Sequence, residues 1–435
     1  MARPVSGWDE GPTPWLGTYP VGVPTSYRYP TVPAARLLDD AAQDFPDAIA
    51  VEYRRYRMTY RKLLDHVDRF ATALSELGVT ADDHVVIALP NCPQLIIALF
   101  ATWRIGAAAT LLPRTRMASA LPDGVRVVVT LDRWYHTAGT TLRAVVPPRC
   151  HVVVTARGDY LPFPRNVVSM LRSRRLRSAR SGGVQPDHVL QLADLVRRSV
   201  PAPQEPADTH QRAAVTATQG TVTQHRLVVN SFQLRLWLPD VVAGDERFLL
   251  AVPLVAAVGT LWMLTAVLSA ATMILVDESR ATQRQRSAVG ARPTILPLDD
   301  DVTSDLLRTS WRRGQLHSVR IALSVGTLDE HVRARLERLT DMGRVRRAWG
   351  IFGLLTHADP IYGRVEVDSV GLPLPDTEAV VVPAGSAAPV VGMRGRLWVR
   401  GPQLARSQWV DTGLEATLAA SGHLTVHCER PDAQR

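Results

Sequence analysis

The stretch HVVIALPNCPQLIIALFATWRIGAAATLLP, residues 84–113, decides the fold. It opens with a short apolar run, rich in valine and isoleucine, that predicts a buried strand. The longer apolar run from Cys92 to Gly106 predicts a helix, because glycine commonly ends one. A second short apolar run, 107–113, predicts another strand. Strand, helix and strand in this order favour a parallel sheet with a crossover helix, so we expect an α/β protein.

The segments on both sides repeat this alternation. Residues 34–53 predict a helix followed by a strand, and Thr59 is expected to cap an amphipathic helix that ends at Gly78. The polar stretch 172–212, rich in arginine, proline and glycine, is expected to be a surface loop. A second set of alternating elements then continues to about residue 350.

The last part of the chain has a different pattern. From about residue 370 to 402, strands with alternating apolar residues are separated by Gly and Pro turns, which indicates a small antiparallel unit. We therefore expect three parts. They are an N-terminal leader over 1–30, an α/β body of two subdomains over 31–365, and the β unit over 366–435.

The distribution of charge argues against nucleic acid as a partner. The formal net charge is +9, but the arginines lie along amphipathic helices and in the loop 172–183, without interleaved aromatic residues on which bases could stack. We therefore expect these arginines to form a solvated surface. Of the 50 Lys and Arg residues, Lys62 is the only lysine.

The cysteines and the apolar segments favour a cytoplasmic protein. The three cysteines show no metal-ligand spacing, and Cys92 is expected to be buried. The first 15 residues lack the apolar core of a signal peptide. The apolar run 248–276 is interrupted by Pro253 and Gly259, so we expect a buried helix and strand and no transmembrane span.

Several phrases resemble the adenylate-forming (AMP-binding) superfamily, most closely its fatty acyl-CoA synthetases. They occur in the family's order at 58–79, 84–113, 158–164, 238–254, 355–364, 370–382 and 395–403. The resemblance implies an N-terminal body of two stacked α/β subdomains plus a small β unit, with the family's mobile C-terminal lid domain absent. It also implies enzymes that use ATP and magnesium to activate a carboxylate and then pass the acyl group to coenzyme A.

The phosphate-binding loop of the family is shortened in this sequence. The resemblance places the loop at TATQGTV, residues 216–222, and implies that Thr218, Gly220 and Thr221 are what remains of a nucleotide site. The Pro-Lys-Gly end of the family's loop is missing. Arg226 could supply a positive charge, but a planar guanidinium on a helix is a poor substitute for a flexible ammonium.

The carboxylate of the family's magnesium site is also missing. In the family it is the Glu of a Tyr-Gly-x-Thr-Glu motif, whereas the matching segment, 347–363, has no acidic residue before Asp359. Without an anionic oxygen ligand a magnesium ion is not retained, so no metal ligands are expected. The resemblance implies that Trp349 and Gly350 keep the wall of the remaining nucleotide site.

The ribose-binding Asp of a Thr-Gly-Asp motif is replaced as well. Leu414 stands at its position, with Asp411 and Glu415 on either side. The resemblance further implies a second catalytic lysine in the C-terminal domain. Lys62 lies on an N-terminal helix and cannot take the place of either lysine.

The acyl side of the site is expected to persist. Val255 and Ala256 stand where the family usually has Phe-His, which makes this side more apolar. Ser324 and Gly326 match a turn that lines the substrate pocket in the family. These four residues are the predicted acyl pocket.

The sequence therefore predicts a degenerate acyl-CoA synthetase-like protein, with no catalytic residues and no cofactor. We expect it to bind an acyl or acyl-thioester ligand, or a protein partner, in an acyl or secondary-metabolite pathway. Three alternatives remain open: an active ligase with rewired residues, an ATP-independent enzyme on the same scaffold, and a subunit completed by a partner chain.

Overall fold

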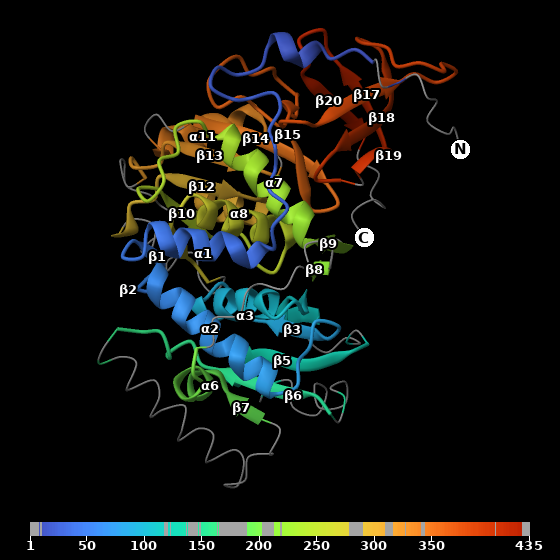
Figure 1. The fold of residues 1–435 in the computed structure, drawn as a ribbon. Helices are drawn as coiled ribbons and strands as arrows, with labels where there is room; N and C mark the ends of the chain where they lie inside the picture. Colours follow the sequence, from blue (N-terminus) through green and yellow to red (C-terminus); the bar gives the residue numbers. More distant parts are fainter. Residues whose placement is uncertain are drawn as a thin grey trace. The chain divides into compact units, whose positions relative to one another are not determined.

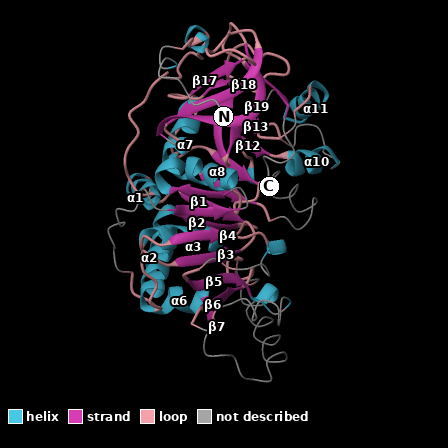
Figure 2. Cartoon of the chain, turned by 90° about the vertical axis from the view of Figure 1, so that its right-hand side faces the viewer, coloured by secondary structure: helices cyan, strands magenta, loops and turns pink. Residues whose placement is uncertain are grey.

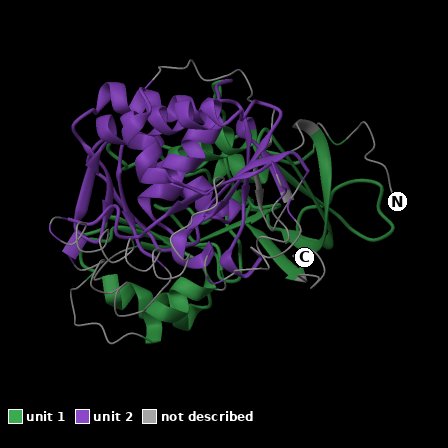
Figure 3. Ribbon diagram, turned by 90° about the horizontal axis from the view of Figure 1, so that it is seen from below, with its two compact units in different colours: residues 1–30, 226–242, 292–435 green, residues 31–225, 243–291 purple. Residues whose placement is uncertain are grey.

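The structure is a computed structural model of the 435-residue chain. It describes residues 8, 11–116, 121, 123–135, 137, 147, 149–162, 164, 189–201, 213–217, 220–277, 290–308, 316–326, 328–340, 344–404 and 406–428. These residues divide into two compact units, coloured separately in Figure 3. Unit 1 comprises 1–30, 226–242 and 292–435, and unit 2 comprises 31–225 and 243–291.

Unit 2 contains a seven-stranded sheet built around the stretch 84–113. Its order is β7-β6-β5-β3-β4-β8-β9, and all neighbours are parallel except β8 and β9. The strands are β3 (His84–Ala88), β4 (Ala108–Leu111), β5 (Val125–Leu131), β6 (His151–Thr155), β7 (Val189–Gln191), β8 (Ala213–Ala217) and β9 (Gly220–Thr223). Strand, helix and strand follow one another in 84–113 as the sequence predicts.

A second group of strands in unit 2 has the order β10-β11-β1-β2. The strands are β1 (Ile49–Tyr53), β2 (Tyr56–Thr59), β10 (Arg247–Leu250) and β11 (Thr272–Leu275). The helices of the unit are α1 (Ala34–Asp44), α2 (Tyr60–Glu76), α3 (Pro93–Arg104), α6 (Leu192–Arg198) and α8 (Ala257–Leu268), with the short 3₁₀ turn η3 (Arg114–Arg116). Helix α2 packs against α3 and α6, which lie on the seven-stranded sheet, and also contacts β1 and β2 (Figures 1 and 2).

The helix ends in unit 2 follow from the sequence. The Thr59 hydroxyl accepts a hydrogen bond from the Lys62 N–H and so caps α2. Gly78 and Gly106 follow α2 and α3 with positive φ angles of 78° and 80°, which glycine adopts without steric cost. The N-cap and both helix ends were predicted correctly.

Two expectations about longer segments had different outcomes. The apolar run 248–276 forms the buried helix α8 and the buried strand β11, as predicted, and it also contains most of β10, which was not predicted. Among the described helices, none has both the length and the apolarity needed to cross a bilayer. The prediction of a loop over 172–212 is wrong for 189–198, where β7 and α6 form, because apolar side chains such as Leu192 and Leu195 pack there.

Unit 1 has a five-strand group and a separate antiparallel sheet. The first has the order β16-β15-β14-β13-β12, with strands β12 (Ile295–Leu298), β13 (Ile321–Ser324), β14 (Arg344–Ile351), β15 (Leu354–Ala358) and β16 (Leu372–Pro373). The second is antiparallel, as predicted, with strands β17 (Glu378–Val382), β18 (Arg394–Gly401), β19 (Arg406–Leu418) and β20 (Leu424–Cys428). The helices are η2 (Pro14–Gly17), α7 (Gln224–Trp237, in unit 1 from Arg226 onward), α10 (Asp300–Arg308) and α11 (Glu330–Thr340).

A buried cation joins three helices of unit 2. Arg104, at the end of α3, hydrogen-bonds to Asp39 of α1 and lies 2.9 Å (Nε to Oδ1) from Asp68 of α2. The Arg104 side chain is only 4% exposed. Burial raises the pKa of Asp68 to about 6, and the positive charge of Arg104 partly offsets this effect.

Candidate functional site

The predicted phosphate-binding loop forms a β-hairpin in unit 2. Strands β8 and β9 pair as far as Ala217 and Gly220, so only Thr218 and Gln219 lie between the paired residues. Thr218 itself lies outside the described residues, and Thr221 is an exposed residue of β9. The expectation of a loop over 216–222 is therefore wrong at 216–217 and 220–222, where backbone groups bond across the hairpin. Two intervening residues offer few free N–H groups for phosphates.

Residues predicted to line the acyl pocket in unit 2 lie beside α8. Val255 is buried, and Ala256 is the N-cap residue of α8. The turn before them is held by Asn91, whose amide donates to the Leu250 and Val252 carbonyls at 3.1 and 2.8 Å. The Asn91 carbonyl oxygen in turn accepts the Leu254 N–H at 2.9 Å. Backbone hydrogen bonds thus fix this turn at the carboxyl end of β10.

The other predicted pocket residues lie in unit 1, at the ends of two neighbouring parallel strands. Ser324, which is fully buried, is the last residue of β13 and pairs with Arg347 of β14. Gly326 follows it, and a Cβ there would lie 2.4 Å from the Asp300 carboxylate, so no larger residue fits. Trp349 lies two residues beyond Arg347 on β14. The structure thus brings Ser324, Gly326 and Trp349 to one edge of the sheet, where α/β proteins bind ligands.

Gly350 has a structural reason to be glycine. A Cβ at Gly350 would lie 1.8 Å from the Leu354 carbonyl oxygen, where β14 and β15 pair with a shift in register. This close approach of two backbones requires glycine irrespective of any ligand. The role of Gly350 in a nucleotide site remains a prediction.

The position of His357 in the family's motif was overlooked in the sequence. Phe352 to His357 reads FGLLTH, which resembles the Tyr-Gly-x-Thr-Glu motif with one extra residue, so His357 follows Thr356 where the motif has its Glu. The His357 ring is fully buried and its centroid lies 5.7 Å from that of Trp349. Burial lowers the pKa of His357 to about 3, which keeps the imidazole neutral. A neutral nitrogen ligand is a poor replacement for a carboxylate on magnesium.

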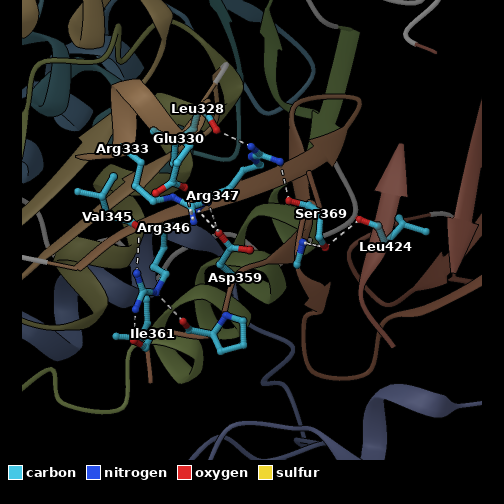
Figure 4. A network of polar contacts seen from close by, with 12 residues as sticks. Leu328, Glu330, Arg333, Val345, Arg346, Arg347, Asp359, Ile361, Ser369 and Leu424 are labelled. Atoms are coloured by element: carbon cyan, nitrogen blue, oxygen red, sulfur yellow. Dashed lines mark hydrogen bonds and ion pairs between the residues drawn. The ribbon is translucent and has the colours of Figure 1, made fainter. Parts of the chain in front are cut away.

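Asp359 accepts a backbone hydrogen bond and lies near the side chain of an arginine in unit 1 (Figure 4). One oxygen of this fully buried carboxylate accepts the Arg347 N–H at 2.9 Å and lies 3.8 Å from Nη2 of Arg333. The side chain of Arg346 donates to the Pro360 carbonyl at 2.8 Å. Burial raises the pKa of Asp359, and the Arg347 N–H and the arginines act in the opposite direction. Asp359 is thus an internal structural group.

The acidic residues beside Leu414 are also paired. Asp411 accepts a hydrogen bond from Arg396 at 2.7 Å, and Glu415 accepts from Arg394 at 2.6 and 2.9 Å. Partial burial raises the pKa of Asp411, but the Arg396 hydrogen bond and other contacts outweigh it, so this pKa lies below its ordinary value. Leu414 is itself buried. Both carboxylates therefore form hydrogen bonds with arginines of β18.

The predicted site residues are therefore divided between the two units. In the part of the chain that the structure describes, no group of three or more His, Cys, Asp or Glu side chains could hold a metal ion. Each of the carboxylates considered above already has one oxygen in a hydrogen bond with an arginine side chain or a backbone N–H group, and these three acids are not grouped as metal ligands. Among the described residues of this segment, His357 stands where the family's motif has its carboxylate.

Comparisons with known proteins show the family. Residues 38–409 match the family described as AMP-binding enzyme. The chain is 25% identical to a long-chain-fatty-acid–CoA ligase of Bacillus subtilis (strain 168) over 451 residues, covering 94% of this chain and 76% of the relative. A ligase of the same name from Escherichia coli O157:H7 is also 25% identical, covering 96% and 81% of the two chains.

Two solved structures share the fold. A long-chain-fatty-acid-CoA ligase from Archaeoglobus fulgidus has a TM-score of 0.74 at 15% identity, covering 96% of this chain and 87% of that one. A benzoate CoA ligase from Burkholderia xenovorans LB400 has a TM-score of 0.73 at 17% identity, covering 91% and 79%. The predicted α/β architecture of an adenylate-forming enzyme is confirmed.

The prediction that the protein uses no cofactor is wrong. We expected no cofactor, but the family matched over most of the chain is one of AMP-binding enzymes, and the curated relatives are CoA ligases. The site residues that differ from the family's motifs do not override a family match over residues 38–409. The chain belongs to the AMP-binding enzyme family, within the adenylate-forming superfamily that its sequence resembles.

Proposed function

We propose that this protein binds an adenine nucleotide and an acyl or acyl-thioester ligand on the family's scaffold but adenylates carboxylates far more slowly than its active relatives. Its role is then an accessory one in an acyl or secondary-metabolite pathway of the cytoplasm, alongside a protein partner. The observation that carries the proposal is His357, a buried neutral imidazole where the motif has a carboxylate.

Features of both units support ligand binding. In unit 1, Ser324 and Trp349 lie at the carboxyl ends of neighbouring parallel strands. In unit 2, Val255 and Ala256 lie at the carboxyl end of β10, in a turn held by Asn91. This edge of a parallel sheet is where α/β proteins place their ligands. The greater apolarity of Val255 and Ala256 suits an acyl chain.

The distribution of charge supports slow adenylation. Catalysis of this kind depends on fixed charges and dipoles aimed at the phosphates, and losing one such group typically slows a reaction ~100-fold or more. Here the hairpin β8–β9 leaves two residues between its paired ends, and Leu414 replaces the ribose-binding acid. The arginine contacts of Asp411, Glu415 and Asp359 disfavour a rewired ligase that uses one of these acids instead.

ATP–pyrophosphate exchange tests this proposal. We expect exchange with fatty and aryl acids to be at least ~100-fold slower than for the Bacillus subtilis ligase assayed beside it, because several fixed charges are missing. Circular dichroism melting of the same preparation confirms that the chain is folded. Exchange within tenfold of the relative's rate, with any simple carboxylate, would overturn the proposal.

A further inference from the structure

Residues 11–30, which we call the leader strap, run along other parts of unit 1. The strap begins at the antiparallel sheet, where the Thr18 hydroxyl donates a hydrogen bond to the Ser421 carbonyl. It then passes α7, whose Phe232 stacks on Tyr27 with ring centroids 5.9 Å apart (Figure 1). Side chains therefore hold the strap both at the antiparallel sheet and beside α7.

Hydrogen bonds also join the strap to the segment between β16 and β17. The bonds are the Tyr19 hydroxyl to the Pro373 carbonyl (2.9 Å), the Tyr29 hydroxyl to the Pro375 carbonyl (3.2 Å), the Tyr27 N–H to the Asp376 carboxylate (2.8 Å) and the Asp376 N–H to the Thr25 carbonyl (3.1 Å). Strand β16 is an edge strand of only two residues, so it makes few bonds of its own to β15. The strap therefore adds support to this edge of the sheet.

The register of β15 and β16 places Pro373 opposite His357. The Leu374 N–H donates to the Thr356 carbonyl at 2.8 Å, so His357 and Pro373 form a pair without hydrogen bonds between them. In such a pair the facing side chains approach closely, and each carbonyl points away from the partner strand. The outward carbonyl of Pro373 is the group to which Tyr19 donates.

Tyr19 also contacts a second group that supports this strand, the ring of Trp237. The two rings meet edge to face with centroids 5.5 Å apart, and the Trp237 indole N–H donates to the Asp359 carbonyl at 2.9 Å. Burial, and then the negative charge of Asp376, raises the pKa of Tyr19, so its hydroxyl stays protonated and can donate. Tyr19 therefore supports the backbone both opposite His357 and two residues after it.

The His357 imidazole depends on these neighbours for its orientation. Its Nδ1 lies 3.0 Å from the Thr356 hydroxyl, and its buried Nε2 has no hydrogen-bond partner among the described residues. The Trp349 ring flanks it on one side, with centroids 5.7 Å apart, and Pro373 lies opposite it on the other strand. A buried nitrogen without a protein partner is available to a ligand, so the orientation of this ring determines which ligand group it can bond.

We propose that Tyr19 is a positioning residue for His357, and that the leader strap keeps β16 closed on β15 so that the imidazole stays fixed beside Trp349. A hydrogen bond to an outward carbonyl stabilises an edge strand that has few bonds of its own. The inference deepens the proposed function, on which it rests for the role of His357 in the site. Loosening the strap lets the ring turn without removing any group from the site.

NMR of the imidazole signals tests this proposal in the protein without nucleotide. The chain has 12 histidines, and His357→Gln identifies the His357 signal when histidine is isotopically labelled at Cε1. Because burial lowers the pKa of His357 to about 3, the ring is neutral at neutral pH and its signal depends on its surroundings and not on its charge. We expect Tyr19→Phe to shift this signal. The variant should fold, since phenylalanine keeps the ring beside Trp237.

Tyr27→Phe is the matched control for this measurement. Tyr27 lies on the same strap, but it binds Asp376 through its backbone N–H, which phenylalanine retains. We expect this variant to leave the His357 signal where it is in the wild type. An unchanged His357 signal in Tyr19→Phe, or equal shifts in both variants, would overturn the proposal.

Hydrogen exchange tests whether Tyr19 acts through the edge strand. Losing one hydrogen bond should make exchange of the Leu374 N–H, which joins β16 to β15, about threefold to tenfold faster in Tyr19→Phe. Faster exchange with an unshifted His357 signal would make the strap a structural support only, and would also contradict the proposal. Since neither measurement needs nucleotide, rapid ATP–pyrophosphate exchange would refute the proposed function and leave the contact between Tyr19 and His357 standing.

Discussion

Replacing Arg104 by Met should lower the free energy of unfolding by about 3–5 kcal/mol at pH 8, the usual cost of removing one partner from a buried ion pair. The Arg104 side chain is 4% exposed and lies between Asp39 and Asp68, so the variant leaves two carboxylates of neighbouring helices without their cation. Urea denaturation measures this loss.

The loss should also depend on pH. Burial raises the pKa of Asp68 to about 6, so in the wild type the stabilising effect of this carboxyl is greatest in acid and declines as the pH rises through 6. Without Arg104 this pKa rises further, and the protonated form of Asp68 carries no charge to leave unpaired. The variant should therefore lose less stability at pH 5 than at pH 8. Arg36→Met, which removes an exposed pair with Asp40, is the control and should cost less than about 1 kcal/mol at both pH values. Equal losses for the two variants would contradict the structure.

Replacing Asp359 by Ala should destabilise the protein by about 3–5 kcal/mol, because it leaves the largely buried Arg333 side chain with the exposed Glu330, 3.8 Å away, in place of its buried carboxylate partner and removes the acceptor of the Arg347 N–H. Figure 4 shows how this carboxylate joins β14, β15 and α11. Thermal unfolding followed by circular dichroism measures the loss. Asp47→Ala, at an exposed ion pair, is the control and should cost less than about 1 kcal/mol.

A catalytic role for Asp359 makes the opposite prediction. If this carboxylate were a rewired metal ligand, the alanine variant would keep its stability and lose only exchange activity. The two measurements on one variant therefore separate a structural carboxylate from a catalytic one.

The alternating elements were predictable because local signals agree with the tertiary structure. Thr59 and Gly106 mark helix ends through their own chemistry, and the apolar run 84–90 suits a strand buried in a parallel sheet. The short elements β7 and α6 were missed because the polar residues around them dominate the pattern. The hairpin at Ala217 and Gly220 was missed because Thr and Gly suit loops and strand ends equally.

The candidate site was less predictable than the fold. The missing lysine is visible in the sequence, since composition alone shows it. The contacts of Asp277 were not visible, because Arg54 and Arg157 are far apart along the chain and reach this buried carboxylate only through the order of the strands. The burial of His357 likewise depends on its neighbours in β14 and β16.

Single-turnover formation of acyl-adenylate measures directly whether this protein adenylates a carboxylate slowly. Protein in excess over radiolabelled ATP is mixed with magnesium and a fatty acid, and the acyl-adenylate is followed by rapid quench beside the Bacillus subtilis ligase. We expect the protein to bind the nucleotide and to form acyl-adenylate at least ~100-fold more slowly than the relative does. Formation of one acyl-adenylate per bound ATP at the relative's rate would contradict it.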